Sequence, residues 1–265
     1  MIEGFLEEAA LPAFEGQLVG LIAPHAGYIY SGLTAAHAFK ALLGKQFARV
    51  ILLSPSHQPY RQPLLTTSHD AYSTPLGLVP VDREALARLN ELLKESNGVE
   101  LAAVRRDQEH SLEIELPFLQ VTQPNGFWLV PLMMVDQSAS MARLLSAALL
   151  KLIQSFPPKE NALLLASSDL SHFYSERAAN RLDGNLADAL QEFDLNAFYQ
   201  RKQHGEMEAC GFAPMATVLQ TSRLLGAEQV TVADYRTSAA VTGDRSSVVG
   251  YLSAIISTGK ADLYA

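Results

Sequence analysis

Short apolar runs alternate along this chain with longer segments whose apolar residues recur at helical spacing, and this alternation restricts the fold. The runs that indicate buried strands are Leu18–Ala23, Arg49–Leu53, Phe127–Met134, Ala162–Ala166, Gln229–Tyr235 and Ser247–Ile256. The segments that indicate helices are Leu33–Leu43, Asp82–Glu95, Ser111–Val121, Ser138–Phe156, Ser175–Phe193, Asp194–Lys202 and Phe212–Leu225. Because strands joined by helical crossovers pair in parallel and are covered on both faces, this order predicts an α/β fold. We expect a mostly parallel central sheet flanked by helices on both faces.

The connections refine this expectation. Residues 236–246 alone join the last two predicted strands, which is too short for a crossover helix, so these strands are expected to form an antiparallel hairpin at the sheet edge. Ser111 is expected to cap the helix that it begins, and Pro117 to shorten that helix. The sequence has no internal repeat and no long linker, which predicts one domain over residues 1–265.

Composition excludes several classes of protein. Of the 265 residues, 48% are hydrophobic and 18% charged, which suits a large core. The net charge of −8 disfavours nucleic acid and anionic membranes as partners. The single cysteine, Cys210, excludes an intramolecular disulfide and a zinc site built from several cysteines. The acidic N-terminus resembles no signal peptide and no apolar run approaches the ~20 residues of a membrane span, so we expect a soluble cytoplasmic protein.

Three of the predicted strands are followed by loops that carry histidine. His25 follows the first strand, His57 the second, and His172 the strand at 162–166. Because the carboxyl ends of parallel strands meet at one edge of a sheet, these histidines are expected to share a site. Imidazole is the commonest metal ligand in proteins, and two histidines with one anionic ligand are typical of non-haem iron sites. The candidate anionic ligands are Glu109, Asp169 and Cys210.

The neighbours of these residues leave alternatives open. Cys210 lies at the predicted start of a helix, which favours the thiolate, although a lone cysteine is also commonly buried and inert. In a helical turn Asp169 would share a face with His172 and orient its imidazole, and Asp169 is equally a candidate helix cap. His110 either faces the same cleft or is solvated.

Other catalytic arrangements find little support. The chain has no G-x-S-x-G elbow, no phosphate-binding P-loop and no G-x-G-x-x-G after its first strand. A Ser56–His57–Asp169 relay and a Ser167–His172 relay stay open, although adjacent residues seldom point at each other. The remaining histidines are expected to be structural or exposed: His37, His69 and His204.

Five blocks of this sequence together resemble the signature blocks of the Memo family, whose prokaryotic members are called AmmeMemoRadiSam system protein B. The blocks are PHAGYIYSG at 24–32, SPSH at 54–57, EHSLE at 109–113, SSDLSH at 167–172 and CG at 210–211. They follow the order and spacing of the family over nearly the whole chain. The A-G-x-[FW]-Y-P segment that usually precedes the first block in the family is missing here, so this chain is either a short member or incomplete at its start.

The resemblance implies a fold similar to LigB-type extradiol dioxygenases, which are non-haem iron enzymes. It implies that His25, His57 and Cys210 line a metal site, with Asp169 and His172 beside it and His110 as the next candidate for the pocket. His172 is the expected acid–base group of a catalytic site there, with Asp169 as its partner. The expected metal is iron, with copper or zinc as alternatives. The dioxygenases use a carboxylate where this family has the cysteine, so ring-cleavage activity does not transfer directly.

The function that the resemblance implies is that of a redox protein, dioxygenase-like in chemistry. The alternatives are a metal-binding, peptide-binding or signalling protein without turnover, and a metal-dependent hydrolase. A small molecule or a peptide is the expected ligand. The family name also suggests functional association with an AMMECR1-type protein and a radical S-adenosylmethionine (SAM) enzyme.

Overall fold

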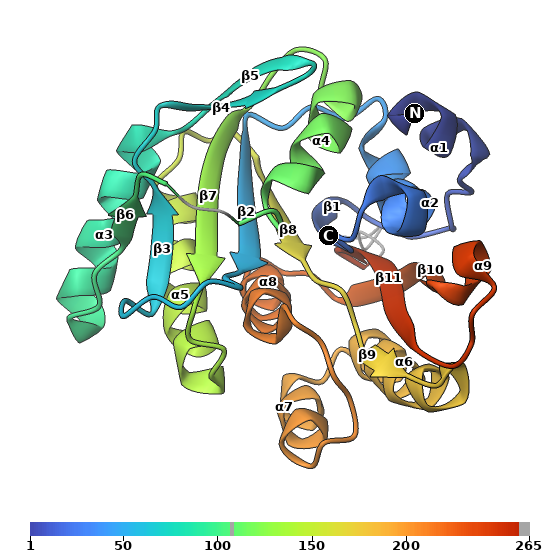
Figure 1. Cartoon of the computed structure of the whole chain (residues 1–265). Coiled ribbons are helices and arrows are strands. Elements are labelled where there is room, and N and C mark those ends of the chain that lie inside the picture. Colours follow the sequence, from blue (N-terminus) through green and yellow to red (C-terminus); the bar gives the residue numbers. More distant parts are fainter. Residues whose placement is uncertain (107–108, 260–265) are drawn as a thin grey trace.

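A mixed sheet of nine strands forms the centre of the protein in the computed structural model, which describes residues 1–106 and 109–259 (Figure 1). This sheet and a separate two-stranded hairpin contain the strands β1 (Leu18–Ala23), β2 (Arg49–Pro55), β3 (Leu64–Thr67), β4 (Ala71–Thr74), β5 (Gly77–Pro80), β6 (Ala102–Val104), β7 (Trp128–Met134), β8 (Ala162–Ser167), β9 (His172–Tyr174), β10 (Gln229–Thr237) and β11 (Val248–Ser257). The main sheet has the order β10-β11-β1-β8-β2-β7-β3-β6, with β9 paired to β11, whereas β4 and β5 form a separate hairpin.

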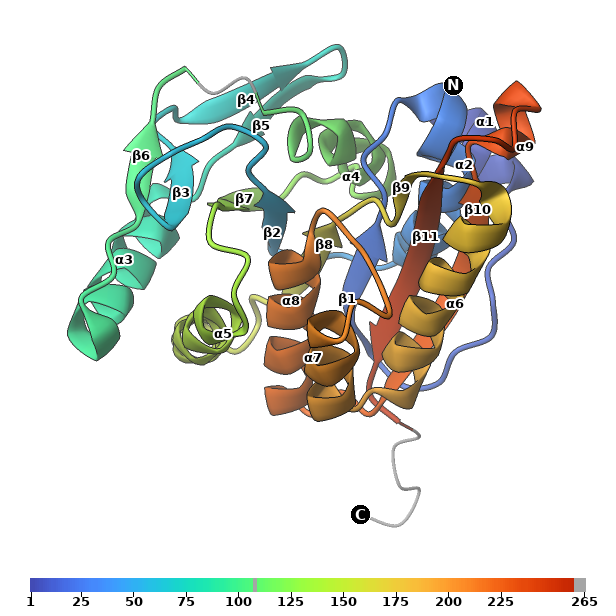
Figure 2. The ribbon, with the colours of Figure 1, turned by 60° about the horizontal axis from the view of Figure 1, so that its bottom comes forward.

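Helices cover both faces of the sheet (Figure 2). They are α1 (Ile2–Glu8), α2 (Tyr28–Phe39), α3 (Arg83–Asn97), α4 (Leu116–Thr122), α5 (Ala139–Gln154), α6 (Glu176–Glu192), α7 (Leu195–Gln203), α8 (Phe212–Leu224) and α9 (Ala239–Thr242), with 3-10 turns η1 (Lys40–Leu42) and η2 (Glu113–Glu115). The predicted α/β class is therefore confirmed. Among the described residues, no helix combines the length and the apolar character needed to cross a membrane.

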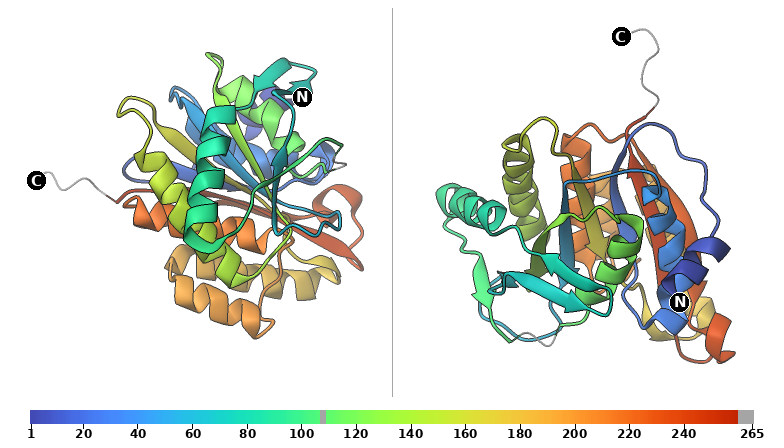
Figure 3. Two further views of the ribbon diagram at one scale, coloured as in Figure 1. Left: turned by 90° about the vertical axis from the view of Figure 1, so that its left-hand side faces the viewer. Right: turned by 90° about the horizontal axis from the view of Figure 1, so that it is seen from above.

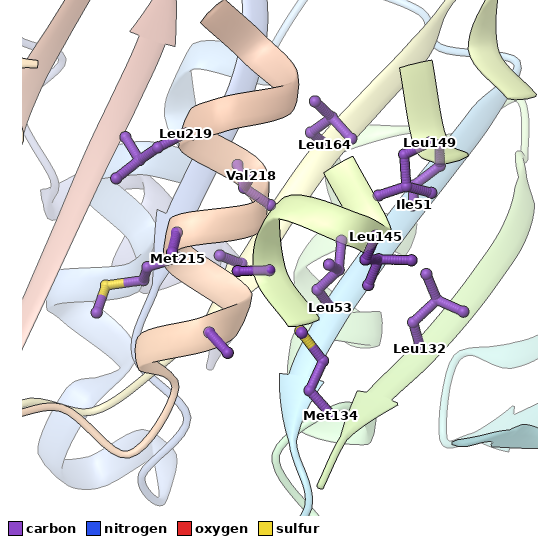
Figure 4. Close-up of a cluster of buried hydrophobic side chains, with 14 of the residues drawn as sticks. Ile51, Leu53, Leu132, Met134, Leu145, Leu149, Leu164, Met215, Val218 and Leu219 are labelled. Carbon is purple, nitrogen blue, oxygen red and sulfur yellow. The ribbon is translucent and has the colours of Figure 1, made fainter. Parts of the chain in front are cut away.

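The alternation of side chains along the central strands produces two apolar cores. In β8, Leu163 and Leu165 belong to the core under α1, α2 and α4, whereas Leu164 and Ala166 belong to the core under α3, α5 and α8. Figure 4 shows the second core, where Val218 of α8 and other apolar side chains of α5 and α8 pack towards β2, β7 and β8. Because both faces are covered, the central strands are apolar throughout, as the sequence indicated.

The direction of the central strands determines where the candidate site lies. Strands β1, β8, β2 and β7 are mutually parallel, so their carboxyl ends lie at one edge, and the arrowheads of β2, β7 and β8 point the same way in Figure 1. The predicted hairpin of the last two strands is confirmed, with β10 at the sheet edge and β11 antiparallel to both β10 and β1. The functional candidates follow the carboxyl ends of β1, β2 and β8.

Several elements differ from the predictions. Helix α2 begins at Tyr28, five residues before the predicted start at Leu33, and ends in the turn η1. Ser111 does not cap the helix predicted from it, because its hydroxyl donates to the carbonyl of Pro55, and α4 begins only after η2. Pro117 occupies the first turn of α4, where a missing amide hydrogen costs little.

Short strands were not predicted at all. Strands β3 and β6 extend the main sheet beyond β7, and β3 runs antiparallel to β7. The hairpin of β4 and β5 lies beside this edge near α4 (Figure 3). Thr74 of this hairpin donates a hydrogen bond of 2.5 Å to Gln120 of α4. Segments of three or four residues carry too little periodicity to be separated from loops.

Candidate metal centre

His25 lies two residues after the end of β1, and its imidazole is held from both ring nitrogens. Its Nδ1 lies 2.8 Å from the hydroxyl of Ser167, the last residue of β8, and its Nε2 lies 3.3 Å from the Sγ of Cys210. The side chain of Asp169 accepts the backbone amides of His25 at 2.8 Å and of Ala26 at 3.2 Å. The loop after β1 is therefore fixed by the loop after β8.

His57 occupies the equivalent place after β2. Its Nδ1 lies 2.9 Å from one carboxylate oxygen of Glu109, and its backbone amide donates to the other oxygen at 2.5 Å. The ring centroids of His25 and His57 are 5.4 Å apart, with the planes nearly perpendicular. Because Nδ1 is occupied in each ring, Nε2 is the nitrogen that each histidine can offer to a ligand.

Cys210 reaches the site from the turn that leads into α8. Its amide donates to the carbonyl of Asp169 at 3.2 Å, and its Sγ accepts the amide of Asp169 at 3.3 Å. Gly211 is required next to it, because a Cβ there would lie 2.4 Å from the carbonyl oxygen of Ser167. The turn therefore packs against the end of β8 and directs the sulfur towards the two imidazoles.

Two groups of side chains in the described residues have metal-binding composition. His25, His57 and Cys210 form one, and His57, Glu109 and His110 the other, each with ligand atoms within 4.8 Å of one another. The first group fits a metal better. Both oxygens of Glu109 already accept N–H donors from three residues, so little lone-pair capacity is left for an ion.

The electrostatics of the first group favour a thiolate. Burial alone would raise the pKa of Cys210, but hydrogen bonds from His25 and His57 lower it to about 6. Burial lowers the pKa of His25, yet the charges of Asp169 and Cys210 raise it to about 9. Hydrogen bonds to Cys210 and Glu109 raise the pKa of His57 to about 10. A soft cation bound here would displace protons from the two imidazoles and the thiol, because each of these groups binds a metal in its deprotonated form.

His110 joins this cluster, as expected for a residue of the same cleft. Its ring stacks on that of His57 at 5.4 Å and lies edge-on to that of His25 at 5.9 Å. Its side chain is 58% exposed, so it stands on the solvent side of the two imidazoles. Three histidines thus converge, and their exposure rises from the buried His25 through His57 to His110, which is the most exposed of the three.

Asp169 and His172 do not form the pair that was predicted from their spacing. The segment folds as a loop followed by β9 instead of a helical turn, so the two side chains do not share a helical face. The carboxylate of Asp169 is engaged by the amides of His25 and Ala26, and Nδ1 of His172 lies 2.8 Å from the carbonyl of Leu170. Asp169 therefore positions the His25 loop, and His172 lies on the neighbouring strand.

The serine relays are not assembled either. The hydroxyl of Ser56 donates to the carbonyl of Gln58 at 3.1 Å, and Ser167 contacts His25 in place of His172. The other histidines behave as expected. Nδ1 of His37 lies 2.8 Å from the carbonyl of Ala10, and His69 and His204 are exposed.

Sequence reasoning missed Glu115, a completely buried acid in η2. Its Oε1 lies 3.0 Å from the hydroxyl of Ser167, and its Oε2 has no hydrogen-bond partner among the residues that the structure describes. Burial raises the pKa of Glu115 to about 8, so the group tends to be neutral. No signal in the sequence indicates this burial, because Glu113 also lies between two apolar residues and is exposed.

Comparison with known proteins shows the family of this chain. The family model described as "Memo-like protein" matches residues 1–255. A "MEMO1 family protein" of Nitrosopumilus maritimus is 36% identical over 234 residues, covering 88% of this chain and 82% of that protein. One from Thermotoga maritima is 35% identical over 239 residues, covering 90% and 82%, and one from Saccharolobus solfataricus is 34% identical over 235, covering 88% and 81%. With this identity over most of both chains, the protein belongs to the Memo family.

Proposed function

We propose that this protein is a metal-dependent oxidoreductase that holds one iron ion between His25, His57 and Cys210. The observation that carries the proposal is the convergence of two imidazole nitrogens and the sulfur of Cys210 from three separate loops, with these atoms within 4.8 Å of one another. This donor set suits iron and also the softer ions copper and zinc. Bound there, iron would supply one-electron chemistry and open positions for a small-molecule substrate.

The surrounding residues take distinct roles in this proposal. His110, at the solvent side of the cluster, is the group that would exchange a proton with a substrate. Asp169 fixes the backbone of the His25 loop and so positions a ligand. His172, on β9 after the same loop as Asp169, is a second acid–base candidate. A free thiolate ligand persists only in a reducing compartment, which supports a cytoplasmic location.

Metal content tests the site. The protein and its variants Cys210→Ser and His25→Ala are purified without oxygen, loaded with ferrous iron and freed of excess metal. We expect about one iron per chain in the parent and a loss in both variants, because each removes one of the three donors. His204→Ala is the matched control and should keep the iron, because this exposed histidine lies 3.7 Å from Glu206 and belongs to neither metal-binding group. Full iron content in both ligand variants would overturn the proposal.

Turnover separates oxidoreductase activity from the alternatives. Iron-loaded protein is screened for oxygen uptake with catechols and other reductants, and zinc-loaded protein for ester and amide hydrolysis without oxygen. Substrate-dependent oxygen uptake that falls in His110→Ala supports the proposal. Hydrolysis with zinc supports the hydrolase alternative, and stoichiometric binding without either reaction supports a binding protein.

A further inference from the structure

The two histidines of the candidate metal centre have chemically different partners on their outer nitrogens. Nδ1 of His57 lies 2.9 Å from a carboxylate oxygen of Glu109, whereas Nδ1 of His25 lies 2.8 Å from the hydroxyl of Ser167. A carboxylate polarises an imidazole more strongly than a hydroxyl does, because it carries a full negative charge. The two rings are therefore unequal as metal donors, although both direct Nε2 towards Cys210.

The carboxylate of Glu109 is buried and hydrogen-bonded at both of its oxygens. Its side chain is only 2% exposed, and a buried carboxylate is stable only when its oxygens are hydrogen-bonded. One oxygen accepts Nδ1–H of His57 and the backbone amides of His110 and Ser111, each at 3.1 Å, and the other accepts the backbone amide of His57 at 2.5 Å. The carboxylate of Glu109 thus binds both the ring and the backbone of His57, which restricts rotation of the ring.

The segment around Glu109 also joins the other loops of the site. The hydroxyl of Ser111 donates to the carbonyl of Pro55 at the end of β2, and the carbonyl of Ser111 accepts the hydroxyl of Ser167 at the end of β8. The hydroxyl of Ser167 also lies 3.0 Å from Oε1 of the buried Glu115, and its remaining lone pair can accept the Nδ1–H of His25. The direct partner of Nδ1 is therefore a hydroxyl in His25 and a carboxylate in His57.

We propose that Glu109 is a positioning residue that acts through His57, fixing its ring and making it the stronger of the two imidazole donors. This inference rests on the proposed metal site. Carboxylate partners of ligating histidines fix the tautomer and raise ligand basicity, and losing one costs about 10- to 100-fold in metal affinity. An imidazole polarised by a carboxylate donates more electron density and so stabilises the oxidised ion. Glu109 therefore lowers the midpoint potential of bound iron.

The test compares metal affinity in Glu109→Gln and Glu113→Gln. Glu109→Gln keeps the size of the side chain and removes its charge. Glu113→Gln is the matched control, because it removes one negative charge from an exposed acid four residues away. The Kd for Co²⁺ is read from the thiolate-to-cobalt absorption band, and the midpoint potential from the iron-loaded protein. We expect Glu109→Gln to weaken Kd by about 10- to 100-fold and to raise the potential, with one ion still bound. Glu113→Gln should change neither.

A double-mutant cycle separates positioning from a general structural role. In a His57→Ala background Glu109 has lost the ring through which it acts, so Glu109→Gln should leave the remaining affinity for Co²⁺ unchanged. An equal loss in both backgrounds would overturn the inference. If Glu109→Gln does not fold, Glu109→Asp retains the charge with a shorter reach and is expected to show the same loss of affinity.

Two failures are distinguishable. A parent protein that binds no metal, or binds it equally well in Cys210→Ser, refutes the proposed site itself. A parent that binds metal through Cys210 while Glu109→Gln keeps Kd within twofold and the potential unchanged refutes the role of Glu109 alone.

Discussion

Replacing Gly211 with alanine should damage both the stability of the protein and its metal site. A Cβ at this position would lie 2.4 Å from the carbonyl oxygen of Ser167 and 2.7 Å from the Cβ of Ser168, where ordinary contact begins at 3.4 Å. Both serines are completely buried, so the turn must move outward by about 1 Å to relieve the clash. Overpacking of this kind costs about 1–3 kcal/mol, and we expect a loss near 2 kcal/mol.

The displaced turn carries Cys210, so metal affinity should fall as well. Sites lose function when ligands move by more than ~0.5 Å, and we expect a Kd at least about tenfold weaker. Urea unfolding followed by circular dichroism measures stability, and competition with a chromophoric chelator measures Kd.

The matched control is Gly184→Ala in α6, where a Cβ meets nothing within 4 Å. Because alanine is favoured over glycine inside a helix, this variant should be more stable by roughly 0.5–1 kcal/mol and bind metal normally. A Gly211→Ala protein whose stability and Kd match those of the parent would refute the close packing described here.

Three further changes are predicted. In metal-free protein, the thiolate absorbance of Cys210 at 240 nm should appear with a midpoint near pH 6 and be lost at lower pH, because the imidazoles lower the pKa of the thiol. The midpoint should move to higher pH in His57→Ala, and a midpoint near pH 9 in the parent would contradict this reasoning. Phe173 has φ +67° and is 78% exposed, so Phe173→Gly should gain about 1 kcal/mol in urea unfolding, whereas Phe193→Gly, also at positive φ but buried, should lose stability. Burial raises the pKa of Glu115 from 4.5 to about 8, so the parent loses stability as pH rises through this range and Glu115→Gln does not. The stability of Glu115→Gln relative to the parent, measured by unfolding metal-free protein, should therefore be greater at pH 8 than at pH 5; an equal difference at both would contradict it.

The parts of the fold that the sequence predicted are those fixed by local patterns. Runs such as Leu18–Ala23 and Ala162–Ala166 are apolar at every position, which requires burial on both faces and therefore a parallel central sheet. The meeting of His25 and His57 followed from the same reasoning, because parallel strands bring their carboxyl ends to one edge. The membership of Cys210 came from the family resemblance, since one cysteine before a helix is weak evidence by itself.

The parts that were missed depend on contacts between residues distant in sequence. Asp169 was paired with His172 because the two are three residues apart, but its hydrogen bonds go to the amides of residues 25 and 26. The backbone there is set by its bonds to Cys210, 41 residues later, which no local pattern encodes. The contact of Glu115 with Ser167 spans 52 residues and was invisible for the same reason.

The most direct test of the metal centre is anomalous diffraction above and below the iron edge, on crystals of protein purified and loaded with iron without oxygen. The account predicts one anomalous peak, present above the edge only, bounded by Nε2 of His25, Nε2 of His57 and Sγ of Cys210. Iron-loaded crystals with no peak at these three atoms, or with iron bound only at exposed histidines such as His204, would contradict it.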